Sequence, residues 1–189
     1  METAESVHDP VSDVPAPPFA IRRLGADDEA VLALLAEQAD DFDLAGRSTP
    51  EDPLSPEDAA AYLADPMVLH WVAEEDGRIV GEILCHLLRM PSGESRELLL
   101  YAIGVRSGDC RRGVGAALVR EMLGWMEDAR VPLVWVLADN PGAEAFYAAS
   151  GFERGGEGDQ GVLMLLETKP GAGRDNDTAC ERTSDGDRT

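Results

Sequence analysis

The segment ELLLYAIGV, residues 97–105, constrains the fold more than any other part of the chain. It is apolar almost throughout, which is typical of a central strand covered on both faces. The next segment, DCRRGVGAALVREML, has apolar residues at helical spacing. A second apolar strand, residues 132–138, and a short helix, GAEAFYAAS, come after it. The chain is therefore predicted to alternate strands and helices around a covered sheet.

Antiparallel strands are expected earlier in the chain. VLHWVAEE and IVGEILCHLLRM, residues 68–75 and 79–90, are predicted to form a hairpin with Asp76 and Gly77 in its tight turn. FAIRRL is a shorter strand before them, and GVLMLLE, residues 161–167, is a last strand near the C-terminus. Together these segments predict an α/β fold with a mixed, mostly antiparallel central sheet flanked by helices.

Two further helices are expected between the first strand and the hairpin. Asp27 and Asp28 offer an N-cap to one of them. Ser55 followed by Pro56 is typical of the start of the other, with proline at the first helical position. The acidic segment 40–54 between these helices is predicted to be a loop.

Both ends of the chain are too polar to fold alone. Residues 1–18 hold four prolines and few large apolar side chains, and residues 168–189 are almost wholly polar. Neither segment buries enough apolar surface to offset the entropy lost on ordering. The length of 189 residues fits a single domain, which we expect over residues 19–167 between two disordered extensions.

Acidic residues far outnumber basic ones. The chain holds 16 Lys and Arg against 37 Asp and Glu, and its formal net charge is −21. Nucleic acids and anionic membranes attract positively charged surfaces, so neither is an expected partner. A cationic small molecule suits this field, although the same charge also serves solubility.

The three cysteines form no recognisable framework. Their number is odd, and no paired Cys or His spacing accompanies them, so neither a disulfide scaffold nor a metal site is expected. No apolar run approaches the roughly 20 residues of a membrane span. The acidic, proline-rich N-terminus also lacks the layout of a signal peptide, and a cytoplasmic location is therefore expected.

The helix start after residue 105 has the character of an anion site. Gly113 and Gly115 leave backbone amides without side-chain cover where the helix dipole favours a phosphate. Arg111 and Arg112 add positive charge. No Gly-Lys-Ser/Thr follows, and the third glycine of the dinucleotide fingerprint is missing. A pyrophosphate fits this stretch, with a solvated helix start as the alternative.

Together with its neighbours, this stretch resembles the GNAT superfamily of acetyl-CoA-dependent N-acetyltransferases. The preceding strand ends in IGV, and CRRGVG, residues 110–115, matches the motif Gln/Arg-x-x-Gly-x-Gly/Ala with Cys110 in its first place. The family's third motif, Asn-x-x-Ala-x-x-x-Tyr-x-x-x-Gly-Phe, is matched by Asn140, Ala143, Tyr147, Gly151 and Phe152. The resemblance covers roughly residues 19–167 and implies a GNAT-like sheet with acetyl-CoA as co-substrate.

A narrower likeness is to the aminoglycoside 3-N-acetyltransferases of the GNAT type, which confer gentamicin resistance. It rests on IRRLGADDEAVLALL, YLADP, SRELLLYAIGV and ADNPGAEAFYAASGF. Members of this group commonly carry Asp after the Tyr of the central strand, where this chain has Ala102 after Tyr101. The likeness implies an aminoglycoside amine as acceptor. A polyamine, a protein N-terminus, or a non-catalytic module that binds an acyl-CoA are the alternatives, and a homodimer is implied because GNAT enzymes often dimerise.

The resemblance also implies which residues bind acetyl-CoA. The backbone of residues 103–105 would pair with the pantetheine arm as an added strand. Amides at the start of the following helix would bind the pyrophosphate. The predicted residues are Ile103, Gly104, Val105, Arg111, Arg112, Gly113, Val114, Gly115, Ala116 and Asn140.

The acid and the base are predicted less uniquely. The resemblance puts the hydroxyl of Tyr147 near the sulfur as general acid, and its reference pKa of about 10 suits a thiol leaving group. A core tyrosine with its hydroxyl at the rim is the alternative. For the base the order of preference is Glu97, then Asp139, then Glu82, and the last two are also predicted to contact the acceptor.

Two kinds of side chain complete the prediction. His70, beside Trp71, and His86, within an apolar strand, are expected to be structural residues. The carboxylates of the acidic segment would attract the ammonium groups of an acceptor. These residues are Asp40, Asp41, Asp43, Glu51 and Asp52.

Overall fold

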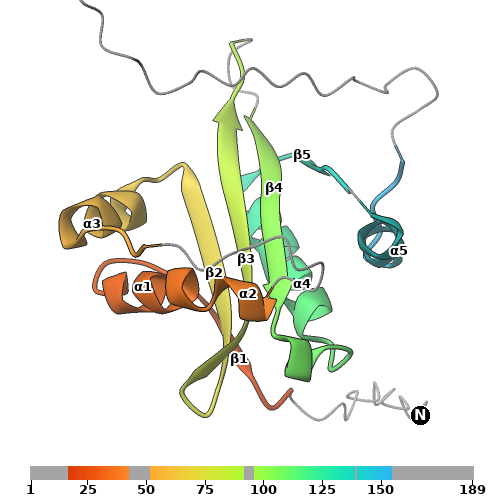
Figure 1. Cartoon of the computed structure of the whole chain (residues 1–189). Coiled ribbons are helices and arrows are strands. Elements are labelled where there is room, and N and C mark those ends of the chain that lie inside the picture. The colour runs from red at the N-terminus through yellow and green to blue at the C-terminus, as the bar shows by residue number, and fades with distance from the viewer. Residues whose placement is uncertain (1–16, 43–51, 92–95, 139, 155–189) are drawn as a thin grey trace, which may run out of the picture. The chain divides into compact units, whose positions relative to one another are not determined.

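The computed structural model describes residues 17–42, 52–91, 96–138 and 140–154, which form a five-stranded sheet with helices packed on it (Figure 1). The strands follow one another in chain order across the sheet. They are β1 (Ala20–Arg23), β2 (Val68–Glu75), β3 (Arg78–Arg89), β4 (Arg96–Val105) and β5 (Leu133–Val136). All neighbours pair antiparallel except β4 and β5, which are parallel. The predicted α/β fold with a mixed, mostly antiparallel sheet is confirmed.

The helices pack on the sheet through two separate clusters of buried side chains. The helices are α1 (Glu29–Glu37), α2 (Ala39–Phe42), α3 (Pro56–Ala64), α4 (Val114–Ala129) and α5 (Pro141–Ala149), with a short 3-10 turn, η1 (Ser107–Asp109), before α4. The larger cluster joins α4 to the sheet. The smaller one joins α1, α2 and α3 to β2 and β3. The sheet therefore has an α4 face and an opposite face.

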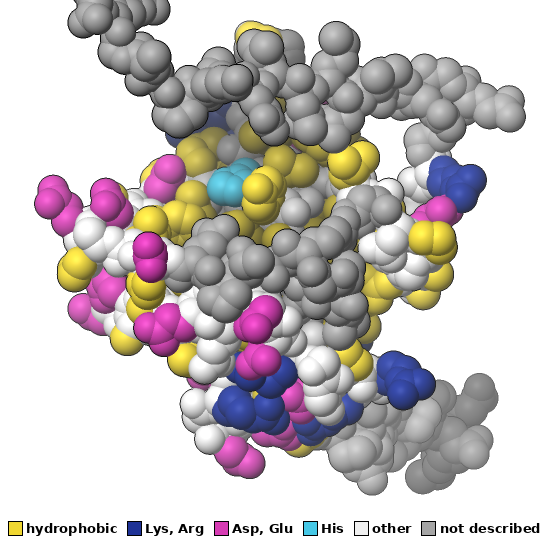
Figure 2. Space-filling view, viewed as in Figure 1, with side chains coloured by type: hydrophobic (Ala, Val, Ile, Leu, Met, Phe, Trp, Pro, Cys, Tyr) yellow, Lys and Arg dark blue, Asp and Glu magenta, His cyan; other side chains and the backbone are white. Residues whose placement is uncertain are grey.

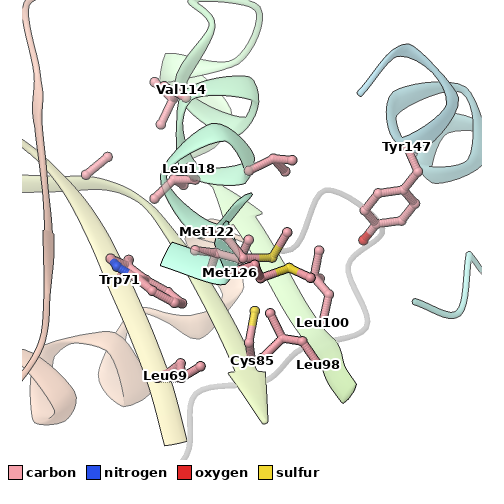
Figure 3. Close-up of a cluster of buried hydrophobic side chains, with 14 of the residues drawn as sticks. Leu69, Trp71, Cys85, Leu98, Leu100, Val114, Leu118, Met122, Met126 and Tyr147 are labelled. Carbon is pink, nitrogen blue, oxygen red and sulfur yellow. The ribbon is translucent and has the colours of Figure 1, made fainter. Parts of the chain in front are cut away.

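The larger cluster follows from the alternation of side chains along the strands. Figure 3 shows its members from β2, β3, β4 and α4: Leu69, Trp71, Cys85, Leu98, Leu100, Val114, Leu118, Met122 and Met126. Each of these side chains is 6% exposed or less. Because Leu98 and Leu100 face α4, the residues between and beside them face the opposite side.

Local sequence signals produce the expected helix start and turn. Ser55 caps α3, since its hydroxyl accepts a hydrogen bond from the amide of Asp58 at 3.2 Å, and Pro56 takes the first helical position. Asp76 and Gly77 have φ values of 51° and 77°. A tight hairpin turn needs this left-handed pair, and asparagine, aspartate and glycine adopt it at low cost.

The start of α1 differs in detail from the prediction. Asp28 occupies the N-cap position, but its carboxylate makes no cap hydrogen bond to the helix. It accepts hydrogen bonds from the amide of Gly25 and the guanidinium of Arg22, both at 2.8 Å. The aspartate therefore stabilises the turn that leads into the helix.

The acidic segment 40–54 is not a loop throughout, as was predicted. Its first residues belong to α2, because Phe42 is buried in the smaller cluster and pulls this turn onto the sheet. Residues 43–51 lie outside the described part of the chain.

β5 is covered on one face only, whereas a fully buried strand was predicted. Val134 and Val136 pack against the larger cluster. Leu133 and Trp135 point the other way and are 49% and 43% exposed. In the described structure β5 is thus apolar on both faces but covered on only one.

The chain divides into two compact units, Met1–Phe152 and Glu153–Thr189, and every described element lies in the first. The strand predicted over residues 161–167 lies outside the described residues, and the domain limits at 19 and 167 stay predictions. No described helix has both the length and the apolar character to cross a membrane.

Candidate functional site

β4 and β5 separate part-way along β4. Their parallel pairing ends where Leu100 lies opposite Val136. β4 continues to Val105, with β3 as its sole strand partner among the described residues. Over residues 101–105 one side of the β4 backbone thus faces no strand in this part of the structure. An edge of this kind can take up an extended ligand as an added strand.

A β-bulge lies where the two strands separate. Leu84 pairs with Ala102 and Cys85 with Leu100, so Tyr101 is an extra residue in β4. As a result Tyr101 and Ala102 both face away from α4. Tyr101 is 67% exposed, and its ring lies 5.5 Å from that of His86, centroid to centroid. The amino-acid sequence carries no signal for this bulge that we recognise.

The three predicted pantetheine-binding residues have different side-chain surroundings. Ile103 and Val105 pack against the larger cluster on the α4 face. Gly104 faces the other side, where a β-carbon would lie 2.9 Å from Cβ of Phe42. A side chain at Gly104 is therefore excluded by α2, and the three residues offer a ligand chiefly their backbone.

The loop before α4 is strained and open, as a backbone anion site would need to be. Arg111 and Gly113 have φ values of 60° and 84°, and Gly113 is the N-cap of α4. A β-carbon at Gly113 would have no atom within 4 Å. Gly115 differs, because its β-carbon would touch the ring of Phe146 on α5. The first turn of α4 thus has uncovered backbone at Gly113 and a packing contact at Gly115.

The two arginines of this loop have different roles. Arg112 forms ion pairs with Glu75 and with the buried Asp109, and Arg78 binds Asp109 as well. The hydrogen bond from Arg78, followed by that from Arg112, lowers the pKa of Asp109 below its usual value. This cluster joins the loop to the β2–β3 hairpin. Arg111 has no acidic partner among the described residues, so its charge remains available to an anion.

α5 carries the predicted acid. Asn140 caps this helix, accepting a hydrogen bond from the amide of Ala143 at 2.9 Å. Tyr147 is 8% exposed, and its ring lies 5.3 Å from Phe146 and 5.4 Å from Phe152. Figure 3 shows the Tyr147 side chain extending from α5 with its hydroxyl at the far end of the ring. The tyrosine is therefore a core residue, packed against two aromatic rings.

The candidate bases occupy different places on the sheet. Glu82 and Glu97 both lie on the face opposite α4 and are half-buried. Glu82 is opposite Gly104, near the end of β4, whereas Glu97 is at its start. At about 3.3 Å per residue these two positions on β4 are about 23 Å apart. Asp139 lies outside the described residues.

Glu82 belongs to a hydrogen-bonded chain that the sequence did not predict. Its Oε2 lies 2.9 Å from Nε2 of the buried His70, and Nδ1 of His70 lies 3.1 Å from the hydroxyl of Tyr62. His86 contacts Tyr101 instead. The hairpin register and the packing of α3 bring Tyr62, His70 and Glu82 together.

The chain matches the family model of the acetyltransferase (GNAT) family over residues 32–152. It belongs to the GNAT acetyltransferase family. Among curated proteins it is 33% identical over 109 residues to N-acetyltransferase 8 of Rattus norvegicus, covering 56% of this chain and 49% of the relative. An uncharacterised N-acetyltransferase of Mycobacterium tuberculosis is 35% identical over 99 residues, covering 51% and 60%. The chain thus spans about half the length of these GNAT relatives.

Solved structures share the fold. An aminoglycoside acetyltransferase from an uncultured soil metagenomic sample superposes with a TM-score of 0.67 at 19% identity, covering 80% of this chain and 96% of the other. The ribosomal-protein-alanine N-acetyltransferase of Brucella melitensis biovar Abortus 2308 gives 0.56 at 17% identity, covering 78% and 99%. At these identities the likeness shows the GNAT fold alone.

In this GNAT protein the acidic segment is partly neutralised by Arg106. Arg106 pairs with Asp41, donates a hydrogen bond to Gln38 at 2.5 Å and lies 4.9 Å from the Phe42 ring centroid. These contacts hold α2 beside the end of β4. Figure 2 shows acidic side chains gathered over the helices of this face. Asp40 and Asp52 are exposed, while Asp43 and Glu51 lie outside the described residues.

Proposed function

We propose that the protein is an acetyl-CoA-dependent N-acetyltransferase that acts on a primary amine of a cationic acceptor. The observation that carries the proposal is the β4 edge over residues 101–105, beyond the end of β5. Val105 at its end lies close to the first turn of α4, since Cγ2 of Val105 would be 3.6 Å from a β-carbon at Gly115. The edge would bind the pantetheine arm, and the helix start the pyrophosphate.

The reaction needs three proton movements, for which this chain has matching groups. The acceptor ammonium first gives a proton to a carboxylate. Its nitrogen then attacks the thioester carbonyl carbon, and the C–N bond forms as the C–S bond breaks. The departing thiolate takes a proton from Tyr147, which recovers one from the acylated nitrogen through solvent. The net products are an amide, CoA thiol and one proton.

An aminoglycoside is the acceptor we propose. The formal net charge of −21 and the acidic face around α1 to α3 favour a ligand with several ammonium groups. Two solved structures that share the fold are those of an aminoglycoside acetyltransferase, one of them in complex with sisomicin. By analogy with the gentamicin-resistance group the modified amine would be the 3-amine. A protein N-terminus is the second candidate, because a ribosomal-protein-alanine N-acetyltransferase also shares the fold.

The proposal is tested by release of CoA thiol from acetyl-CoA with a panel of amines. The panel holds gentamicin-type aminoglycosides, polyamines and basic N-terminal peptides. We expect turnover with an aminoglycoside, with mass spectrometry locating the acetyl group on the 3-amine. Turnover with the peptides alone would show that the acceptor is a protein N-terminus and not an aminoglycoside. Binding of acetyl-CoA without turnover of any amine would overturn the enzymatic function.

A further inference from the structure

The hydrogen-bonded chain of Tyr62, His70 and Glu82 joins three elements on the face opposite α4. Tyr62 lies on α3, His70 on β2 and Glu82 on β3. His70 is 7% exposed, and both of its ring nitrogens are used within the chain. A buried imidazole with two partners has one fixed orientation, so it can hold the carboxylate beyond it in place.

The contacts define a donor order that begins at the phenol of Tyr62. Burial, with the charge of Glu82, raises the pKa of Tyr62 to about 12, so the phenol keeps its proton at neutral pH. It donates that proton to Nδ1 of His70. With Nδ1 accepting, the imidazole donates from Nε2 to the carboxylate of Glu82. The hydrogen bond from His70 therefore aligns the Glu82 carboxylate.

Glu82 is held but remains accessible. Its side chain is 22% exposed, and Oε2 is the oxygen that binds His70. Its Cα is opposite that of Gly104 on β4, in the stretch whose outer edge pairs with no strand among the described residues. Neighbouring strands are about 4.8 Å apart, so a ligand amine on this face can reach the carboxylate directly or through one water.

We propose that Glu82 is the carboxylate that takes the proton from the acceptor ammonium, and that His70, backed by Tyr62, is its positioning residue. This inference rests on the proposed N-acetyltransferase function. The proton moves from the ammonium nitrogen to Glu82 and then to solvent, and the hydrogen bond from His70 keeps the carboxylate directed during the transfer. Glu97, on the same face but about 23 Å away at the start of β4, does not take the proton.

A matched pair of variants at position 70 isolates the positioning role. In His70→Gln the amide nitrogen replaces Nε2 and keeps the hydrogen bond to Glu82. In His70→Asn the amide replaces Nδ1, so it reaches Tyr62 and loses Glu82. The two variants are similar in polarity and differ in which end of the chain they keep. Each is made in the wild-type and in the Glu82→Gln background, with Glu97→Gln beside them.

We measure kcat and KM for the amine that turns over best, the Kd of acetyl-CoA and the thermal midpoint. Glu82→Gln is expected to lower kcat by about a hundredfold, as removal of a general base does. His70→Asn should lower kcat by about tenfold through misplacement of the carboxylate, and His70→Gln by less than about threefold. Acetyl-CoA affinity should not change. In the Glu82→Gln background His70→Asn should have no further effect, because both act on the same step.

Each contrary result has a separate meaning. If the wild type turns over no amine, the proposed function fails and this inference fails with it. Turnover that survives Glu82→Gln but is lost in Glu97→Gln overturns the inference alone and moves the base to Glu97. Equal losses in His70→Asn and His70→Gln, or an undiminished loss in the Glu82→Gln background, would show that His70 acts on packing and does not position Glu82.

Discussion

Gly115 and Phe146 are in direct contact across the junction of α4 and α5. A β-carbon at Gly115 would lie 3.2 Å from Cε2 and 3.3 Å from Cζ of the Phe146 ring. Tyr147 follows Phe146 in the chain, and the two rings are 5.3 Å apart. The absence of a side chain at Gly115 therefore helps to set where the candidate acid lies.

Substitution of Gly115 should be graded by size. In Gly115→Ala the ring must move by a few tenths of an ångström, and alanine's better helix propensity offsets that cost, so the unfolding free energy should change by less than about 1 kcal/mol. Gly115→Leu overpacks the contact and should cost about 1–3 kcal/mol. Denaturant unfolding measures both. Equal stability of the wild type and the leucine variant would mean that α5 moves freely relative to α4.

Gly113 should respond to charge in addition to backbone strain, because any side chain at its φ of 84° is strained. Gly113→Glu places a carboxylate where we propose that the pyrophosphate binds, and it should raise the Kd of acetyl-CoA at least about a hundredfold. The matched control is Gly113→Gln, which has the same backbone strain at the left-handed φ and a side chain of the same length without the charge. Calorimetric titration should show a clearly smaller loss of affinity for this control than for Gly113→Glu. Retained affinity in Gly113→Glu would move the pyrophosphate elsewhere.

The contrast between these glycines marks one limit of the sequence analysis. From the motif alone, Gly113 and Gly115 were both predicted to leave backbone amides uncovered so that they can bind a phosphate. Gly113 has the properties of such a site, because its φ is left-handed and its surroundings are open. Gly115 is needed instead for packing, because a larger side chain there would clash with Phe146. Phe146 lies on another helix, and no local sequence pattern connects the two residues. Spacing predicted which residues matter but not which contact requires each glycine.

Arg111 and Arg112 should separate binding from stability. Arg111 has no acidic partner among the described residues, so Arg111→Gln should weaken acetyl-CoA binding by about threefold to tenfold and leave the unfolding free energy unchanged. Arg112→Gln breaks the ion pairs to Glu75 and Asp109 and should lower the thermal midpoint instead. The reverse pattern would assign the phosphate contact to Arg112.

Asp109 should make the free energy of unfolding depend on pH under acidic conditions. Hydrogen bonds, first from Arg78, hold its pKa below the usual value, so the folded state binds this proton less readily than the unfolded state does. Its stabilisation is complete above the ordinary aspartate pKa of about 3.9 and is lost as pH falls through the lower, folded value. Asp109→Asn should therefore cost about 1–3 kcal/mol near neutral pH. Denaturant unfolding from pH 7 to about pH 3 should show the gap from the wild type shrink; a constant gap would contradict the mechanism.

The hairpin shows why the sheet was easier to predict than the site. Alternation and the Asp76–Gly77 turn located β2 and β3 correctly. A regular ladder from that turn would put Glu82 opposite Trp71, on the other face from His70. The register shift at Ala73 and Glu74 pairs Glu82 with Val72 instead, which brings it to the face of His70. Such a bulge depends on packing across the sheet. The hydrogen-bonded chain of Tyr62, His70 and Glu82 could therefore not be predicted from the sequence.

Tyr147→Phe tests the acid while keeping the aromatic core. The ring contacts with Phe146 and Phe152 are retained, so the aromatic packing is kept and the Kd of acetyl-CoA should stay close to wild type. Loss of the hydroxyl should lower kcat by about a hundredfold if it protonates the leaving thiolate. Phe152→Leu is the control, since it loosens the same cluster and keeps the hydroxyl; it should lower stability by about 1 kcal/mol and kcat by little. An unchanged kcat in Tyr147→Phe would remove this residue from the mechanism, and equal losses of kcat in both variants would assign its role to packing.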